Sequence, residues 1–157
     1  MIRSSRPDRR RPLAAGALAA LPVLAGLAGL AGLAGCAPGG QEDAAGLAAA
    51  AFLRALRDGD EDAACRALAP RARQALVSAA KAPCPQALAE AARSALPASA
   101  VRQAAVREVD VWGREARVTV RGDTLFLSRF DDGWRVTAAG CRARPSAPGY
   151  DCGIQGS

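Results

Sequence analysis

The chain of 157 residues carries 21 Lys or Arg side chains against 15 Asp or Glu, and it contains no histidine. Without histidine, Ser/His, Cys/His and His/Asp catalysis and histidine-based metal sites are excluded. The formal charge of +6 is concentrated at the start, where residues 1–12 hold five arginines and one aspartate. Residues 36–157 are close to neutral, with 16 basic and 14 acidic side chains, so we expect no nucleic-acid partner.

Residues 1–35 have the pattern of a bacterial signal peptide. The arginine-rich start is followed by residues 13–34, which carry no charge, and by the run Leu33-Ala34-Gly35-Cys36. This run resembles a lipobox, the cleavage and lipidation site of exported bacterial lipoproteins. The resemblance implies cleavage before Cys36 and a diacylglyceryl anchor on its sulfur. The anchor would hold the protein to the lipid bilayer, on the extracytoplasmic face of the cell membrane.

A permanent transmembrane anchor is the main alternative, because the uncharged segment is close to the ~20 residues that span a bilayer. Its composition argues against this, since Ala and Gly are frequent and Pro22 lies in the middle. Plain secretion is a second alternative. The run Arg9-Arg10-Arg11 leaves the choice between Sec and twin-arginine export open.

The first part of the mature chain has helical patterning. Residues 36–43 contain Pro38, Gly39 and Gly40, and they predict a flexible tether to a domain that spans residues 44–157. Apolar residues then recur at helical spacing up to Arg57.

The following residues predict three more helices. The break Asp58-Gly59-Asp60 ends the first helix, and Asp60 is expected to cap a second helix that reaches Leu68. Two prolines suit the first turns of further helices, which we place at residues 71–80 and 86–96. Pro97 is expected to end the last of them.

From about residue 101 onward, β-branched residues alternate with polar ones. The pattern predicts four strands, over residues 106–112, 115–121, 124–130 and 134–140. In the second strand, Ala116, Val118 and Val120 share one face, as in a half-buried antiparallel strand. Turn residues between the strands indicate a meander, and residues 150–154 suggest a short edge strand. Helices followed by strands predict an α+β fold, with the N-terminal helices packed on one face of a curved antiparallel sheet.

The four cysteines after Cys36 are an even number in a chain expected to be exported, which favours disulfides. Four cysteines allow three pairings. We favour Cys65–Cys84 and Cys141–Cys152, because each bond then stays within one half of the domain. These bonds would close loops of 18 and 10 intervening residues. A zinc site is the competing interpretation, but the close Cys-x-x-Cys spacing typical of such sites is absent.

Five segments resemble parts of small actinobacterial lipoproteins with an NTF2-like domain, also called cystatin-like or SnoaL-like. They are residues 52–60, 64–68, the Asp-Asp-Gly-Trp-Arg-Val run at 131–136, and the cysteine segments 139–141 and 150–152. The resemblance implies a conical sheet folded against helices, a C-terminal disulfide clasp, and a cavity that some relatives use for binding or catalysis. Enzymatic relatives often rely on an Asp/His pair, which this chain cannot supply. The fold alone defines no function.

Two short motifs have a functional and a structural interpretation. The acidic residues from Asp58 to Asp62 suit a cation site, but a helix break with an N-cap explains them more simply. Residues 121–123 spell the adhesion tripeptide Arg-Gly-Asp, yet Gly-Asp between two strands is also what a hairpin turn needs. We favour the structural interpretation for both.

Arginines and aromatic residues are the remaining candidates. A sheet face is expected to carry five polar residues as solvated surface or as an anion- or partner-binding patch: Arg117, Thr119, Arg121, Arg129 and Arg135. The aromatic residues of the strands are expected to pack in the core and hairpins, with the alternative that one of them lines a ligand pocket: Trp112, Phe126, Phe130 and Trp134.

The sequence predicts a membrane-anchored, non-catalytic binding or accessory module for a protein or small ligand at the cell surface. No catalytic residue, metal ligand or cofactor is assigned. A carboxylate-dependent NTF2-like enzyme and a structural subunit of a membrane complex are the alternatives. Convergent carboxylates in the concavity of the sheet would favour the enzyme, and an apolar, filled core would disfavour it.

Overall fold

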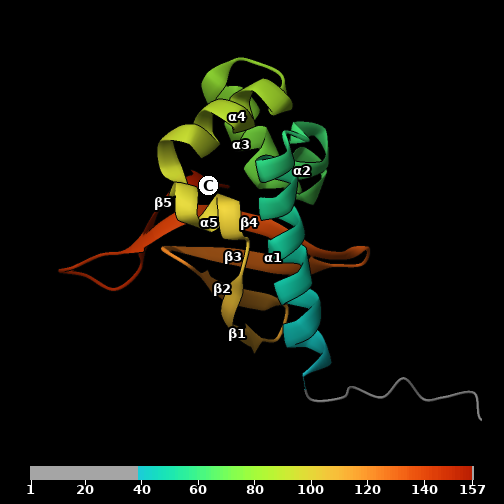
Figure 1. The fold of residues 1–157 in the computed structure, drawn as a ribbon, viewed down its shortest axis with the longest axis vertical. Helices are drawn as coiled ribbons and strands as arrows, with labels where there is room; N and C mark the ends of the chain where they lie inside the picture. Colours follow the sequence, from blue (N-terminus) through green and yellow to red (C-terminus); the bar gives the residue numbers. More distant parts are fainter. Residues whose placement is uncertain (1–38, 157) are drawn as a thin grey trace, which may run out of the picture. The chain divides into compact units, whose positions relative to one another are not determined.

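The computed structural model describes residues 39–156, so Cys36 and the signal segment 1–35 lie outside the described residues. The expected α+β fold is confirmed, because five helices precede five strands in this part of the chain (Figure 1). The helices are α1 (Gly40–Asp58), α2 (Glu61–Ala67), α3 (Pro70–Ala80), α4 (Cys84–Ala95) and α5 (Ala98–Gln103). No helix between residues 39 and 156 is long and apolar enough to cross a membrane.

The strands form one open antiparallel sheet in the order β1-β2-β3-β4-β5. They are β1 (Val106–Trp112), β2 (Glu115–Val120), β3 (Asp123–Phe130), β4 (Gly133–Ala143) and β5 (Tyr150–Gln155). The meander expected from the turn residues is therefore present, and the candidate edge strand near Tyr150 completes it.

Helix α1 begins at Gly40, inside the segment expected to be a flexible tether at residues 36–43. Glu42 and Asp43 lie in its first turn, where negative charge stabilises the positive end of the helix dipole. The tether prediction was therefore wrong for residues 40–43. The glycines that suggested flexibility mark the helix start, since Gly39 adopts the left-handed conformation at the N-cap.

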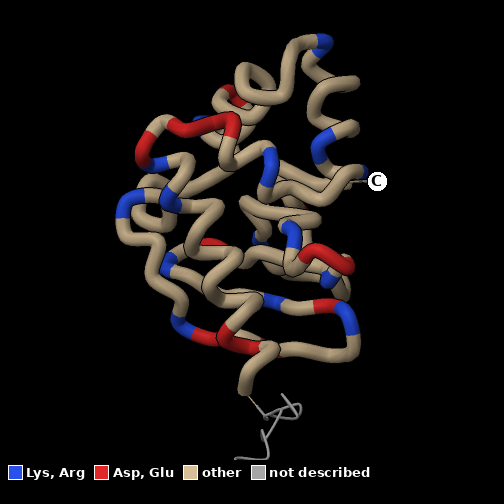
Figure 2. The backbone as a smooth tube through the Cα atoms, turned by 90° about the vertical axis from the view of Figure 1, so that its right-hand side faces the viewer, with Lys and Arg blue, Asp and Glu red and all other residues tan. Residues whose placement is uncertain are grey.

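The acidic run between α1 and α2 forms a helix break with a cap, as the sequence predicts (Figure 2). The Asp60 carboxylate accepts the Ala63 backbone N–H at 2.9 Å. Gly59 closes α1 in the left-handed conformation, and its N–H and that of Asp60 bond to carbonyls of the last turn. The acidic residues therefore have a structural explanation that requires no cation.

Helix α5 was not predicted. Pro97 was expected only to end the preceding helix, but it also serves as the N-cap residue of α5. Ala100 is buried and Val101 half-buried against the core, which explains why Val101 gave a strand-like signal. Ala104 ends the helix in the left-handed conformation, so the chain enters β1 only at Val106.

The helices cover one face of the sheet, and the core lies between them. On β2 the predicted inward residues Ala116, Val118 and Val120 are all buried. Leu125 and Leu127 continue this face on β3. The helical side contributes large and small apolar residues to the same core: Ala45, Ala49, Phe52, Leu53, Ala64, Leu68 and Leu88. The helix-covered face of the sheet is thus filled by apolar side chains.

Two disulfides join residues within the helical part and within the sheet. Cys65 of α2 is bonded to Cys84, the first residue of α4, and Cys141 of β4 is bonded to Cys152 of β5. This is the pairing that the sequence favours. Because all four cysteines are consumed in these bonds, none of them is left to ligate zinc.

Glycines allow the β4–β5 hairpin to approach the helices closely. A Cβ atom on Gly153 would lie 2.1 Å from the Ala95 Cβ at the end of α4. A Cβ atom on Gly156 would lie 2.8 Å from the Ala72 nitrogen in the first turn of α3. The chain end after β5 therefore lies directly against the start of α3.

Candidate functional site

The Arg-Gly-Asp tripeptide is part of the fold, with its carboxylate turned inward. Asp123 is 5% exposed and is the only buried charged residue between residues 39 and 156. Its carboxylate accepts the backbone N–H groups of Thr124 at 2.7 Å, Cys141 at 2.8 Å and Gly140 at 3.1 Å. An adhesion receptor would need this carboxylate at the surface, so the structural interpretation is the correct one.

Burial raises the pKa of the Asp123 carboxyl above its ordinary value of 3.8. The three N–H donors and the nearby Arg142 oppose this shift, because they favour the charged form. The group ties the start of β3 to the irregular middle of β4. Its environment is thus explained by a structural role.

Two carboxylates of β1 and β2 have separate partners. The Asp110 carboxylate accepts hydrogen bonds from Nε and Nη2 of Arg117, at 3.1 and 2.7 Å. The Glu115 carboxylate accepts a hydrogen bond from the Ser128 hydroxyl at 2.7 Å. Among the residues that the structure describes, no group of three His, Cys, Asp or Glu side chains is placed to hold a metal ion. The surface hollows of the domain are the remaining places for a binding site.

Two adjoining hollows lie between the start of α3 and the β3–β4 hairpin, and we call them together the α3 groove. The first has a volume of about 350 Å³ and is lined by Ala69, Pro70, Arg71, Ala72, Ser128, Phe130, Thr137 and Gly156. The second, of about 360 Å³, is lined by Arg66, Leu68, Pro70, Arg73, Phe130, Asp132 and Arg135. Pro70 and Phe130 line both, so the hollows meet over an apolar centre.

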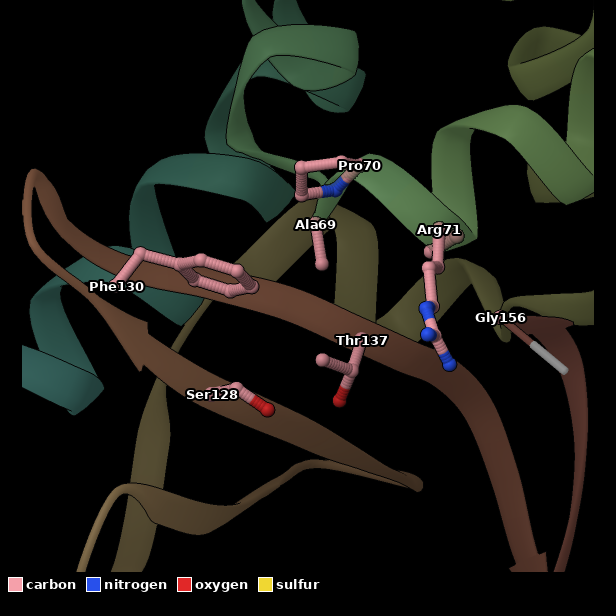
Figure 3. Close-up of a pocket in the computed structure, with 8 residues that line it drawn as sticks. Ala69, Pro70, Arg71, Ser128, Phe130, Thr137 and Gly156 are labelled. Atoms are coloured by element: carbon pink, nitrogen blue, oxygen red, sulfur yellow. The ribbon is translucent and has the colours of Figure 1, made fainter.

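Backbone hydrogen bonds fix the walls of the α3 groove. The Ala69 N–H donates to the Val136 carbonyl at 2.8 Å, which fastens the start of α3 to the edge of β4. At the other end of the groove, the Gly156 N–H donates to the Thr137 carbonyl at 3.2 Å and holds the chain after β5 against β4. Figure 3 shows Arg71 reaching from α3 toward the sheet, with Phe130, Ser128 and Thr137 below the start of the helix.

An irregularity in the sheet lies in the α3 groove. Leu127 of β3 pairs with Val136, whereas the preceding Phe126 pairs with Ala138, so Thr137 is an extra residue in β4. Such bulges redirect side chains and are frequent beside functional sites. The bulge leaves the Thr137 side chain in the lining of the first hollow.

The arginines of the α3 groove differ in their partners. Arg135 bonds to the Asp132 carboxylate and to the Arg66 backbone carbonyl. The side chains of Arg66, Arg71 and Arg73 are exposed, and none has an ion-pair partner among the described residues. The groove thus contains one neutralised arginine and three uncompensated ones.

The arginine face expected from the strands is not a single patch. Arg117, Thr119 and Arg135 occupy the face away from the helices, but Arg129 alternates with Ser128 and belongs to the opposite side. Arg121 lies in the turn beyond β2. The expectation was therefore wrong as stated, and only Arg135 of this group reaches the α3 groove.

The aromatic residues are also less buried than expected. Of the four aromatic residues expected in the strands, only Trp134 is buried, whereas Trp112 is 51% and Phe130 36% exposed. Phe126 packs edge-on against Tyr150 with ring centres 4.9 Å apart. Phe130 lines the α3 groove.

Arg66, Arg71 and Arg73 were missed by sequence analysis. They lie on two helices and become neighbours of the β3–β4 hairpin only through tertiary packing. No family model matches the chain, and no curated protein or solved structure matches it either.

Proposed function

We propose that the protein is a lipid-anchored extracytoplasmic binding module, tethered to the membrane through Cys36, which binds its ligand in the α3 groove without catalysis. In this proposal its domain is a variant of the NTF2-like cone. The lipobox-like run supports the anchor, and two disulfides suit an oxidising compartment. The order of helices and strands and the one-sided helical cover support the fold relationship.

The observation that carries the binding role is the α3 groove. It combines an apolar centre, where Phe130 is partly exposed, with arginines that have no acidic partners. Ligand sites commonly join an apolar lining to a few polar groups that orient the ligand. The helix-covered face of the sheet is filled by apolar residues, so an open surface groove is favoured over a catalytic interior.

The anchor is tested on protein extracted from native membranes. We expect the intact mass to correspond to a chain beginning at Cys36 with an attached diacylglyceryl group. Cys36→Ala is expected to prevent both the modification and the cleavage before that position. An intact mass that retained residues 1–35 without lipid in the unaltered protein would overturn the lipoprotein proposal.

The binding role is tested by mass spectrometry of molecules retained by the purified lipoprotein. Phe130→Ser removes the apolar centre of the groove, and Trp112→Ser is a matched control at an exposed aromatic residue outside it. We expect Phe130→Ser to lose a molecule that the unaltered protein and the control both retain. Equal retention by all three proteins would contradict binding in this groove.

A further inference from the structure

We propose that the α3 groove recognises an oxyanion, a phosphate or a carboxylate, on a ligand that also has an apolar part. Arg66, Arg71 and Arg73 supply the positive charge, and Pro70 with Phe130 supplies the apolar contact. This inference rests on the proposed function, since it names the ligand class of the same groove. It concerns the chemistry of the ligand and is independent of the lipid anchor.

The charge of the groove is the first argument. Its lining holds four arginines and one aspartate, so three positive charges remain after Asp132 pairs with Arg135. Residues 36–157 carry only two more basic than acidic side chains. The rest of that surface is therefore slightly negative, and positive charge is concentrated at the groove. Such local concentration attracts anions even when the net charge is small.

The chemical type of the three free cations is the second argument. A guanidinium presents parallel N–H donors that match the two oxygens of a carboxylate or phosphate. Arg71 also lies in the first turn of α3, an 11-residue helix with no acidic residue in that turn and no side-chain cap. The positive end of the helix dipole therefore adds to the field of the arginines.

The apolar centre is the third argument, because it separates a specific ligand from a free inorganic ion. Pro70 and Phe130 lie between the two arginine-lined hollows, and Phe130 remains 36% exposed. A ligand that combines an oxyanion with an apolar body would cover this ring while its charge reaches Arg71 or Arg73. The same chemistry is offered by soluble metabolites and by anionic lipid headgroups.

The test uses calorimetric titration of the mature lipoprotein in maltoside micelles with small probes. Phenyl phosphate and benzoate carry an oxyanion on a ring, benzyl alcohol is neutral, and benzylamine is a cation. The groove variant is Arg66→Gln, Arg71→Gln and Arg73→Gln combined. The control variant combines Arg54→Gln, Arg102→Gln and Arg107→Gln, three exposed arginines that do not line the groove.

We expect phenyl phosphate to bind more tightly than benzyl alcohol or benzylamine, and more weakly as salt is added. The groove variant should raise the Kd of phenyl phosphate at least tenfold, and the control variant should raise it less than twofold. The Kd of the Arg71→Lys variant should lie between these two values, because lysine keeps the charge and loses the paired donors. Competition by phosphatidylglycerol added to the micelles, but not by phosphatidylcholine added in the same way, would identify a lipid headgroup, and no competition would identify a soluble ligand.

Equal weakening in the two triple variants would overturn the inference, because only net charge would then matter. Absence of phenyl phosphate and benzoate binding by the unaltered protein would overturn it as well. Neither result affects the lipid anchor at Cys36 or the retention experiment with Phe130→Ser. A failure of the oxyanion inference is therefore distinguishable from a failure of the proposed function.

Discussion

The helices α2 to α4 and the strands β1 to β4 are stabilised in different ways. The three helices have 7, 11 and 12 residues, and each buries only one or two of them: Ala64 and Cys65 in α2, Ala72 in α3, and Ala87 and Leu88 in α4. The strands are joined by antiparallel ladders, regular between β2 and β3, and bury Val118, Val120, Leu125 and Leu127 completely or nearly so. Isolated helices of this length are marginal in water. The helical region therefore depends on the sheet and on Cys65–Cys84, whereas the sheet is held by its own hydrogen-bond ladders.

The largest effect is expected at Phe52, which lies on α1 where both regions meet. Its side chain is fully buried in the core shared by helices and sheet. Phe52→Ala should lower the free energy of unfolding by about 3–5 kcal/mol, through lost burial and the cavity left behind. Denaturant unfolding measures this change. Leu47→Ala, at a residue 66% exposed on the same helix, is the control and should stay within about 0.5 kcal/mol.

One disulfide lies in the helical region and the other in the sheet. Loop-closure entropy predicts that removing either bond costs about 3 kcal/mol, with the two values within roughly 0.5 kcal/mol of each other. The local consequences should nevertheless differ. With Cys65→Ala and Cys84→Ala, amide exchange should accelerate throughout α2 to α4 and little in β2 and β3, because the sheet keeps its ladder.

With Cys141→Ala and Cys152→Ala, faster exchange should be confined to β5 and the adjoining part of β4. Hydrogen exchange followed by mass spectrometry measures both variants. Uniform acceleration across the domain in either variant would mean that helices and sheet unfold as one unit. The distinction between the two regions would then be wrong.

Asp123 tests how β3 is held to β4. Asp123→Asn places an amide NH₂ opposite the Gly140 N–H, so a buried donor loses its acceptor. The expected loss of stability is about 1–3 kcal/mol. The pKa of Asp123 is raised in the folded protein, so the folded state binds its proton more tightly than the unfolded chain.

The upward shift of the Asp123 pKa fixes how stability depends on pH. The contribution of Asp123 is fully present below its unfolded pKa of about 3.8 and is lost as pH rises through the raised value. The difference in unfolding free energy between the unaltered protein and Asp123→Asn should therefore narrow as pH increases across this window. A difference that widened instead would show that the three N–H donors outweigh the desolvation.

Much of the fold is visible in the sequence because its signals are local. The alternation of apolar residues predicts β2 to within a residue, with Ala116, Val118 and Val120 buried as expected. The helix cap is also found at the predicted residue, Asp60. Helix α5 was missed because Val101 packs inward from a helix and resembles a strand residue in its pattern. The α3 groove was missed for another reason, since Arg71 and Phe130 are distant in the chain and meet only after packing.

The smallest effect, at Asp60, tests whether α2 depends on its disulfide. Asp60→Ala removes the cap on the Ala63 N–H and should cost about 1 kcal/mol in the unaltered background. Without Cys65–Cys84, α2 should already open locally, so the same substitution should then cost much less. Unfolding free energies of the four proteins in this double-mutant cycle measure the coupling. If the cost of Asp60→Ala is the same in both backgrounds, α2 stays folded without the bond, and its packing against the neighbouring helices and the sheet must be enough to hold it.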